Sequence, residues 1–170
     1  MSTVVLIGPP GAGKSSVGKA LAKIAQLPFH DTDALIEERS QKKISEIFVD
    51  DGEPVFRKLE AEVVSESLQL LTGVLSLGGG AILDPKTQSL IQSSSAHVVF
   101  LDVSIAQAGP RVGFNKDRPL LLINPRQQWL SLMEKRRPIY EELADFTVST
   151  DNKKPNEVAH EIAILLGILS

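Results

Sequence analysis

Residues 3–15 read TVVLIGPPGAGKS, an apolar run followed at once by a glycine-rich loop, and this stretch decides the fold. An apolar run without polar alternation is typical of a strand buried on both faces. The loop, residues 8–15, matches the pattern G-x-x-x-x-G-K-S/T in full. An ordinary Gly/Pro turn before a helix is the alternative, but strand, glycine loop and helix follow in the order that the motif requires. The stretch therefore predicts a P-loop, in which backbone N–H groups and the positive end of the next helix surround phosphate.

Outward from this stretch, short β-branched runs alternate with longer segments of helical pattern. We expect strands at residues 3–7, 28–30, 73–77, 97–101 and 146–149, and helices at residues 14–25, 34–39, 52–70, 85–93, 125–142 and 156–166. Asn124 before Pro125 has the pattern of an N-cap followed by proline at the first helical position. This alternation predicts an α/β fold with a parallel sheet covered by helices on both faces. Ligands of such sheets bind beyond the carboxyl ends of the strands, so the polar residues that follow each strand are candidates for function.

The composition is that of one soluble globular domain. The chain has 170 residues, of which 42% are apolar and 23% charged. A net charge of −3 gives no basic face for duplex nucleic acid, and with no cysteine there are no disulfides or thiolate metal sites. The apolar run at residues 162–169 is far shorter than the roughly 20 residues that span a bilayer. The N-terminus shows no basic leader, so we expect a cytoplasmic protein with no nucleic-acid or membrane partner.

Charged and hydroxyl side chains follow the first two expected strands. In the P-loop, Lys14 would reach the β- and γ-phosphates of a nucleotide, and the Ser15 hydroxyl would ligate Mg²⁺. Asp31 and Asp33 follow the second strand, and carboxylates at i and i+2 of an extended chain point to the same side. One could face the magnesium ion and the other an acceptor hydroxyl. Alternatively, Asp33 is a plain N-cap of the next helix.

A glycine run and an acid follow the third and fourth expected strands. Gly78, Gly79 and Gly80 lose much backbone entropy on folding, which favours close approach of the main chain to a ligand over a merely flexible turn. Asp102 stands where a Walker B strand would carry a magnesium carboxylate. Because Asp31 competes for that role, we favour a helix cap near Ser104 as the role of Asp102.

Arginines stand at positions that the sheet would bring to one cleft. Residues 111–118 are polar and contain a glycine, a composition that suits a mobile lid closing over bound nucleotide. A cation delivered by such a lid would neutralise charge on the transferring phosphoryl group. The candidates are Arg57, Arg111, Arg118, Arg136 and Arg137.

Together these stretches resemble the shikimate kinase family, and the likeness covers nearly the whole chain. The P-loop alone is shared by many NTPases, but D-T-D, G-E-x-x-F-R-x-x-E, G-G-G and R-P-L-L in this order are highly specific. These motifs are residues 31–33, 52–60, 78–80 and 118–121, and they are followed by Arg136 ahead of Pro138, Ile139 and Tyr140.

The resemblance implies both a fold and an activity. The implied fold is that of P-loop NTPases, nucleoside-monophosphate-kinase-like, with a five-stranded parallel sheet in the order 2-3-1-4-5, flanking helices and a mobile lid. A single domain would span residues 1–170, with a substrate-binding subregion at about 31–62 and the lid at about 111–124. The implied activity is Mg²⁺-dependent transfer of the γ-phosphate of ATP to the 3-hydroxyl of shikimate, in aromatic amino-acid biosynthesis through chorismate. ATP and shikimate would be the partners of a monomer.

By position, the resemblance also implies roles for individual residues. Lys14, Asp33 and Arg118 would be catalytic, with Asp33 holding the ring hydroxyls and accepting the attacking proton. Glu60 would orient Arg57 from one helical turn away. The implied metal ligands are Ser15 and Asp31; the implied shikimate contacts are Asp33, Arg57, Gly78, Gly79, Gly80 and Arg136; the implied ATP contacts are Gly11, Ala12, Gly13, Lys14, Ser15, Ser16, Arg111, Arg118, Lys153 and Pro155.

Two features depart from the family pattern, near the adenine and near the lid. The loop of residues 150–155 offers lysines where the family often has an arginine. Pro110, after Gly109, stands where the family usually continues a helix, and we expect it to end that helix early.

Two other functions remain as alternatives. One is a related P-loop kinase of gluconate type, since gluconate is also a hydroxylated carboxylate. The other is a P-loop regulatory switch that hydrolyses ATP slowly and re-orders its segments. A switch has no use for the acceptor pocket that Asp33, Arg57 and Arg136 would build.

Overall fold

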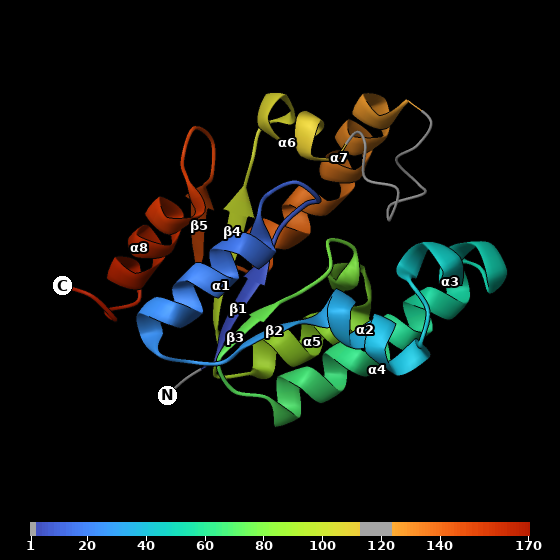
Figure 1. Cartoon of the computed structure of the whole chain (residues 1–170), viewed down its shortest axis with the longest axis horizontal. Helices are drawn as coiled ribbons and strands as arrows, with labels where there is room; N and C mark the ends of the chain where they lie inside the picture. Colours follow the sequence, from blue (N-terminus) through green and yellow to red (C-terminus); the bar gives the residue numbers. More distant parts are fainter. Residues whose placement is uncertain (1–2, 113–123) are drawn as a thin grey trace.

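The computed structural model of the protein describes residues 3–112 and 124–170 (Figure 1). The strands in these residues are β1 (Val4–Ile7), β2 (Phe29–Asp31), β3 (Val74–Ser76), β4 (His97–Asp102) and β5 (Phe146–Ser149). The helices are α1 (Lys14–Ala25), α2 (Thr32–Ser40), α3 (Ile44–Asp50), α4 (Glu53–Leu70), α5 (Pro85–Ser93), α6 (Ile105–Val112), α7 (Pro125–Leu143) and α8 (Pro155–Leu165), with a 3₁₀ turn η1 at Ala81–Leu83. The expected α/β fold is confirmed.

The strands form one parallel sheet in the order β2-β3-β1-β4-β5, which is the order that the resemblance implies. The central strand β1 pairs with β3 on one side and with β4 on the other. Because βαβ crossovers are right-handed, α1 covers one face of the sheet and the helices of the later crossovers cover the other. The contacts agree, since α1 packs against α8 while α5 contacts both α4 and α7 (Figure 1).

The strand register brings the loops after β1, β2 and β3 to one edge of the sheet. Ser76, the last residue of β3, pairs with Asp31 at the end of β2 and with Leu6 near the end of β1. The P-loop, the aspartates after β2 and the glycine run after β3 therefore start side by side. This edge is where parallel sheets bind their ligands.

The core lies on both faces of the sheet, and every residue of β1 is buried, as its unbroken apolar run predicts. A second, smaller apolar cluster lies among α2, α3 and α4. It holds in place the segment that carries the candidate acceptor residues after β2 and on α4. Its buried members are Ile36, Ile44, Ile47, Phe56 and Val63.

Two of the described helices, α3 and α6, were not among the predicted ones, and the expectation that Pro110 ends its helix early is wrong. Helix α3 has seven residues, too few for its periodicity to stand out in the sequence. Pro110 lies inside α6, which continues to Val112 instead of ending early. Proline removes one N–H bond to the preceding turn, yet α6 continues past it, and this helix packs against α7.

The start of α7 agrees with the sequence prediction only in part. Pro125 is the first residue of α7, as expected, but Asn124 caps the helix without a side-chain hydrogen bond, at a left-handed φ of 48°.

Within residues 3–112 and 124–170, no helix combines the length and the apolar character needed to cross a membrane.

Candidate active site

The P-loop follows β1 and leads into α1. Gly11 and Gly13 have φ angles of 86° and 85°, a region that residues with a Cβ rarely adopt. Lys14, the first residue of α1, is buried, and its Nζ donates to the carbonyls of Gly8 at 2.8 Å and Pro9 at 3.1 Å. The glycines therefore shape the loop, and Lys14 places a positive charge beside the N-terminus of α1, where an anion is already favoured.

Ser15 and Asp31 join the P-loop to the end of β2. The Ser15 hydroxyl donates to Asp31 Oδ2 at 2.5 Å, and the Asp33 backbone N–H donates to Asp31 Oδ1 at 2.9 Å. Asp31 is thus the N-cap of α2, and the interpretation of Asp33 as that cap is wrong. The extended i, i+2 geometry is also wrong, because β2 ends at Asp31 and Asp33 lies in the first turn of α2.

The oxygen atoms of Ser15 and Asp31 fit a magnesium ion. Mg²⁺ prefers oxygen ligands and keeps several waters and substrate phosphates, so it needs only one or two protein ligands. Within the described part of the chain, no group of three or more His, Cys, Asp or Glu residues gathers to form a fuller metal site. The hydroxyl and carboxylate beside the P-loop are therefore the pair suited to a metal ion held mainly by phosphate.

The glycine run after β3 lies against the charged side chains of the cleft. A Cβ on Gly78 would sit 2.7 Å from Asp33 Oδ1 and 3.1 Å from Glu60 Oε2. A Cβ on Gly79 would sit 3.3 Å from Arg136 Nη1, and one on Gly80 would overlap the Arg57 guanidinium. The run is therefore no flexible turn, because its lack of side chains makes room for the charged groups of this cleft. Four predicted residues meet there: Asp33, Arg57, Glu60 and Arg136.

Arg57 and Glu60 form an ion pair on α4. Arg57 Nη1 donates to Glu60 Oε1 at 2.8 Å, which is the contact that the i, i+3 spacing predicts. Glu60 is almost fully buried, and its burial raises the pKa of the carboxyl above its ordinary value, while Arg57 opposes that shift. Arg57 is partly exposed and reaches a second acid, Glu53, at 3.5 Å. Glu60 thus holds the Arg57 guanidinium at the wall of the cleft.

Arg136 brings a second guanidinium to the same place from α7. Its side chain is only 5% exposed, and its Nε has no hydrogen-bond partner. Burial lowers the pKa of Arg136, and the nearby charge of Arg57 acts in the same direction. Unpaired buried donors and like charges both cost free energy, and an anion between the two guanidinium groups would relieve both. The geometry suits a carboxylate, which accepts parallel hydrogen bonds from guanidinium groups.

Two cavities meet at the P-loop. The first, of about 210 Å³, is lined by the loop and by Asp31, Asp33, Ser76 and Leu77. The second, of about 240 Å³, lies between the loop and the start of α8. Both share Gly13, Ser16 and Arg111 in their linings, so a ligand with phosphates in the first could place its base in the second. The second lining is Ala12, Gly13, Ser16, Val17, Arg111, Thr150, Lys153, Pro155 and Val158.

Arg111 and Lys153 lie at the second cavity but already make contacts with the protein. Arg111 Nη1 donates to the Gly11 carbonyl at 2.9 Å, from the last turn of α6. Lys153 Nζ pairs with Glu161 at 2.8 Å. Pro155 opens α8 at the rim. Arg118 and residues 113–123, where most of the expected lid would lie, are outside the residues that the structure describes.

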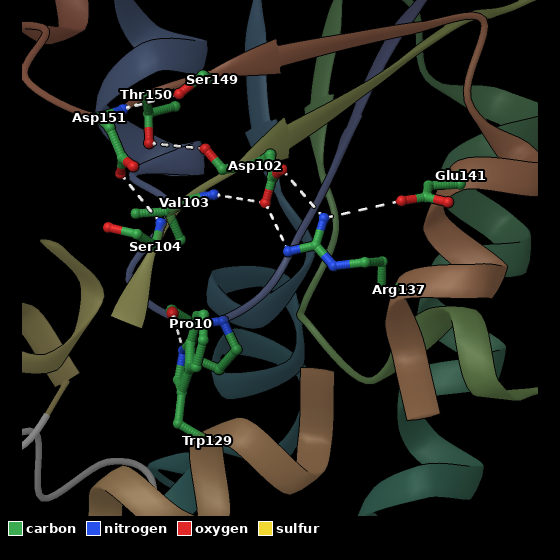
Figure 2. Close-up of polar contacts among 10 residues, drawn as sticks. All are labelled: Pro10, Asp102, Val103, Ser104, Trp129, Arg137, Glu141, Ser149, Thr150 and Asp151. Carbon is green, nitrogen blue, oxygen red and sulfur yellow. Dashed lines mark hydrogen bonds and ion pairs between the residues drawn. The ribbon is translucent and has the colours of Figure 1, made fainter. Parts of the chain in front are cut away.

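Asp102 and Arg137 turn out to be partners of each other. Arg137 Nη1 and Nη2 donate to the two Asp102 carboxylate oxygens at 3.0 and 2.9 Å, and Glu141 lies 3.7 Å from the same guanidinium (Figure 2). Both carboxylate oxygens of Asp102 are therefore engaged by Arg137, and the expected role of Asp102 as a helix cap is wrong, because Ser104 Oγ accepts from Gln107 N at the start of α6 instead. Arg137 is not a cleft arginine, because its side chain leaves α7 in a different direction from that of Arg136.

Two aromatic residues at the site were missed in the sequence. The Trp129 indole N–H donates to the Pro10 carbonyl of the P-loop at 2.9 Å (Figure 2), and the Tyr140 hydroxyl donates to the Gly79 carbonyl at 2.6 Å. Both are buried on α7. Tyr140 stands within a stretch that carries the family resemblance, but no signal in the sequence distinguishes Trp129 from a core residue of an amphipathic helix.

Comparisons with known proteins agree with this geometry. The shikimate kinase family model matches residues 10–166. A shikimate kinase of Thermobifida fusca is 51% identical over 159 residues, which cover 94% of this chain and 91% of the relative. The solved shikimate kinase from Acinetobacter baumannii in complex with shikimate is 33% identical, with a TM-score of 0.94 over 99% of this chain and 94% of that chain. A gluconokinase from Sinorhizobium meliloti is 22% identical with a TM-score of 0.60 over 98% of this chain and 92% of its own, a likeness of fold alone.

Proposed function

Since the chain belongs to the shikimate kinase family, we propose that it transfers the γ-phosphate of ATP to the 3-hydroxyl of shikimate, giving shikimate 3-phosphate and ADP. One observation carries the proposal beyond family membership. Buried Arg136 and the paired Arg57 converge beside Asp33, at the edge of the sheet where the P-loop also begins. A cyclic hydroxylated carboxylate has the charge and the hydroxyl groups for that corner.

The donor half of the cleft would hold the triphosphate. The backbone of the P-loop and the N-terminus of α1 would bind the β- and γ-phosphates, with Gly11, Ala12, Gly13 and Ser16 along the way and Lys14 neutralising charge. Ser15 and Asp31 would hold Mg²⁺, which would supply positive charge to neutralise the phosphates. Because Asp31 also caps α2, the metal ligand and the turn that carries Asp33 are built as one unit.

The acceptor half of the cleft would hold shikimate by its carboxylate. Arg136 from α7 and Arg57 from α4 would each donate to the carboxylate, and Glu60 would keep the Arg57 guanidinium in place through their 2.8 Å contact. The backbones of Gly78, Gly79 and Gly80 would face the ring, since these glycines lie against the same side chains. The carboxylate then replaces water around cations that have already lost part of their hydration.

Asp33 would act on the attacking hydroxyl. Its carboxylate lies beside the glycine run and lines the cavity of the P-loop, so it stands between the two halves of the cleft. From there it can accept hydrogen bonds from ring hydroxyls and take the proton as the oxygen attacks the γ-phosphate. Arg118, assigned by the family resemblance alone, would neutralise the transferring phosphoryl group from the lid.

The base of the nucleotide would occupy the cavity between the P-loop and α8. Arg111 would lie on one side of the adenine, with Lys153 and Pro155 on the other. The Arg111 contact with Gly11 fixes the guanidinium next to the loop, where its flat face is suited to stacking on the base. We place the protein as a monomer in the cytoplasm, acting as one domain of residues 1–170 in aromatic amino-acid biosynthesis.

The test is an ADP-release assay with alternative acceptors. Purified protein with ATP and Mg²⁺ is supplied with shikimate, gluconate, AMP or no acceptor. Of the four conditions, we expect saturable ADP release only when shikimate is the acceptor. Phosphorus NMR should place the product phosphate on the 3-hydroxyl. Turnover with gluconate at a similar kcat/KM would favour the rival kinase, and equal ADP release without an acceptor would favour a switch.

A further inference from the structure

The carbonyl groups of the P-loop are held by donors from the loop itself and from two distant parts of the chain. Lys14 Nζ donates to the carbonyls of Gly8 and Pro9, Arg111 to Gly11, and Trp129 to Pro10. Lys14 and Arg111 have roles in the proposed function. Trp129 has none so far, although it is 4% exposed and reaches across 119 residues of sequence to its acceptor.

The Pro10 carbonyl belongs to a peptide of the loop whose orientation can reverse. Ala12 N donates to the Pro9 carbonyl at 3.2 Å, which closes a β-turn with Pro10 and Gly11 at its centre. Gly11 has a φ of 86°, the value of the third residue of a type II turn. Type I and type II turns differ by a flip of the central peptide, and a Pro-Gly centre accepts both.

The hydrogen bond from Trp129 selects one of these two orientations. Because the peptide is planar and trans, the Gly11 N–H points opposite to the Pro10 carbonyl. Because the indole N–H holds that carbonyl towards α7 (Figure 2), the Gly11 N–H points away from α7. Gly11 lines the same cavity as Lys14 and Ser15. A flipped peptide would present a carbonyl oxygen where a phosphate needs a donor.

The same face of α7 supports the acceptor side of the cleft. Trp129, Met133, Arg136 and Tyr140 are all buried, and their spacing of three to four residues places them on one face of the helix. Tyr140 donates to the Gly79 carbonyl, and Pro10 Cδ lies 3.1 Å from the position that a Cβ of Gly79 would take. One helix face therefore fixes one carbonyl in each of the two loops.

From this geometry we propose that Trp129 is a positioning residue for the nucleotide phosphates. It acts through the Pro10–Gly11 peptide and rests on the proposed function only in assuming that the P-loop binds a nucleotide. Tyr140 is its counterpart on the acceptor loop. The Trp129 indole contacts the loop proposed to bind nucleotide, and the Tyr140 hydroxyl contacts the loop proposed to bind the acceptor. Separate substitutions of the two residues can therefore test the two contacts one at a time.

The experiment compares Trp129→Phe with Tyr140→Phe, each of which removes one hydrogen-bond donor and keeps an aromatic ring. ADP binding measured by calorimetry should weaken about tenfold in Trp129→Phe, because without the indole donor the flipped Pro10–Gly11 peptide competes with the orientation that binds phosphate. In steady-state kinetics the KM for ATP should rise in Trp129→Phe and the KM for shikimate in Tyr140→Phe. Leu130→Ala, at an exposed position of the same helix, should leave both KM values unchanged.

The outcomes separate a positioning role from a packing role. If ADP binding in Trp129→Phe stays within twofold of wild type, or if both KM values rise together with a matching loss of melting temperature, the proposal is wrong. The ADP titration needs no acceptor, so it stands even where turnover with shikimate fails.

A second measurement needs no variant. Trp129 is the only tryptophan of the chain, so its fluorescence reports on the P-loop contact directly. We expect the emission to change when ADP is added and to stay constant with shikimate alone. An emission spectrum that does not respond to saturating ADP would contradict the proposal, even if Trp129→Phe did not fold.

Discussion

Replacement of Arg136 by methionine should weaken shikimate binding and at the same time stabilise the free protein. Methionine has a similar length, but it cannot donate the hydrogen bonds that a carboxylate accepts. Removing one partner of a buried charged pair costs about 2–5 kcal/mol, so the KM for shikimate should rise from about 30-fold to several thousand-fold. The kcat should fall much less if the carboxylate contact is equally strong in the ground state and the transition state.

The stability gain follows from the surroundings of Arg136. Arg136 is 5% exposed, its Nε lacks a partner, and its pKa is lowered by burial and further by the nearby charge of Arg57. Replacing buried charge by an apolar side chain of similar size is often neutral or stabilising. A gain of about 1 kcal/mol would raise the melting temperature of a chain of this size by roughly 2–4 °C.

Arg137→Met is the matched control, because it changes the neighbouring arginine of the same helix. Arg137 pairs with Asp102 instead of facing the cleft, so this variant should lose a little stability and keep the shikimate KM. Steady-state kinetics and differential scanning calorimetry measure both quantities. The reasoning is refuted if Arg136→Met keeps a wild-type KM, or if Arg137→Met raises the KM equally.

Other substitutions test the remaining parts of the cleft. Lys14→Ala should lower kcat by about a thousandfold or more, because a main cation at the β- and γ-phosphates is lost; near-normal turnover would contradict the assigned role. Asp33→Asn should lower kcat by about 10²–10⁴ and leave the KM for ATP unchanged, whereas an equal loss of ADP binding in calorimetry would make Asp33 structural. Glu60→Gln should raise the melting temperature at pH 7 while weakening shikimate binding. Burial raises the pKa of Glu60 above 4.5, so its contribution to stability is present at lower pH and lost as the pH rises through the folded pKa. The gain of Glu60→Gln over wild type should therefore shrink as the pH falls towards 4.5, and a gain independent of pH between 4.5 and 7 would show that desolvation is not its cause.

The donor half of the site could be predicted from the residues themselves. The apolar run of β1, the glycines at positive φ and the following lysine are all local features, and each acts through neighbouring backbone. The acceptor half came from the family resemblance. Arg57, Glu60 and Arg136 look like ordinary helix residues in isolation, since the i, i+3 spacing of the first two is common on exposed helices.

Some errors arose because neighbouring residues compete for the same role. Asp31 caps α2 and Asp33 does not, and this outcome depends on where β2 stops pairing with β3. Pro110 stays inside α6, a helix that also contacts α7, although proline leaves one backbone hydrogen bond of the helix unmade. Local preferences decide such positions only when no tertiary contact opposes them.

The amino-acid order by itself determined the alternation of strands and helices and the shape of the phosphate loop, because both depend on interactions within a few residues. Only the tertiary structure decided which side chains face the cleft. Arg136 and Arg137 are adjacent, yet one residue of helix rotates the side chain by about 100°, and the packing of α7 turns the first inward and the second towards Asp102. The bond from Trp129 to Pro10 joins residues 119 positions apart, and no local rule can set a contact of that range.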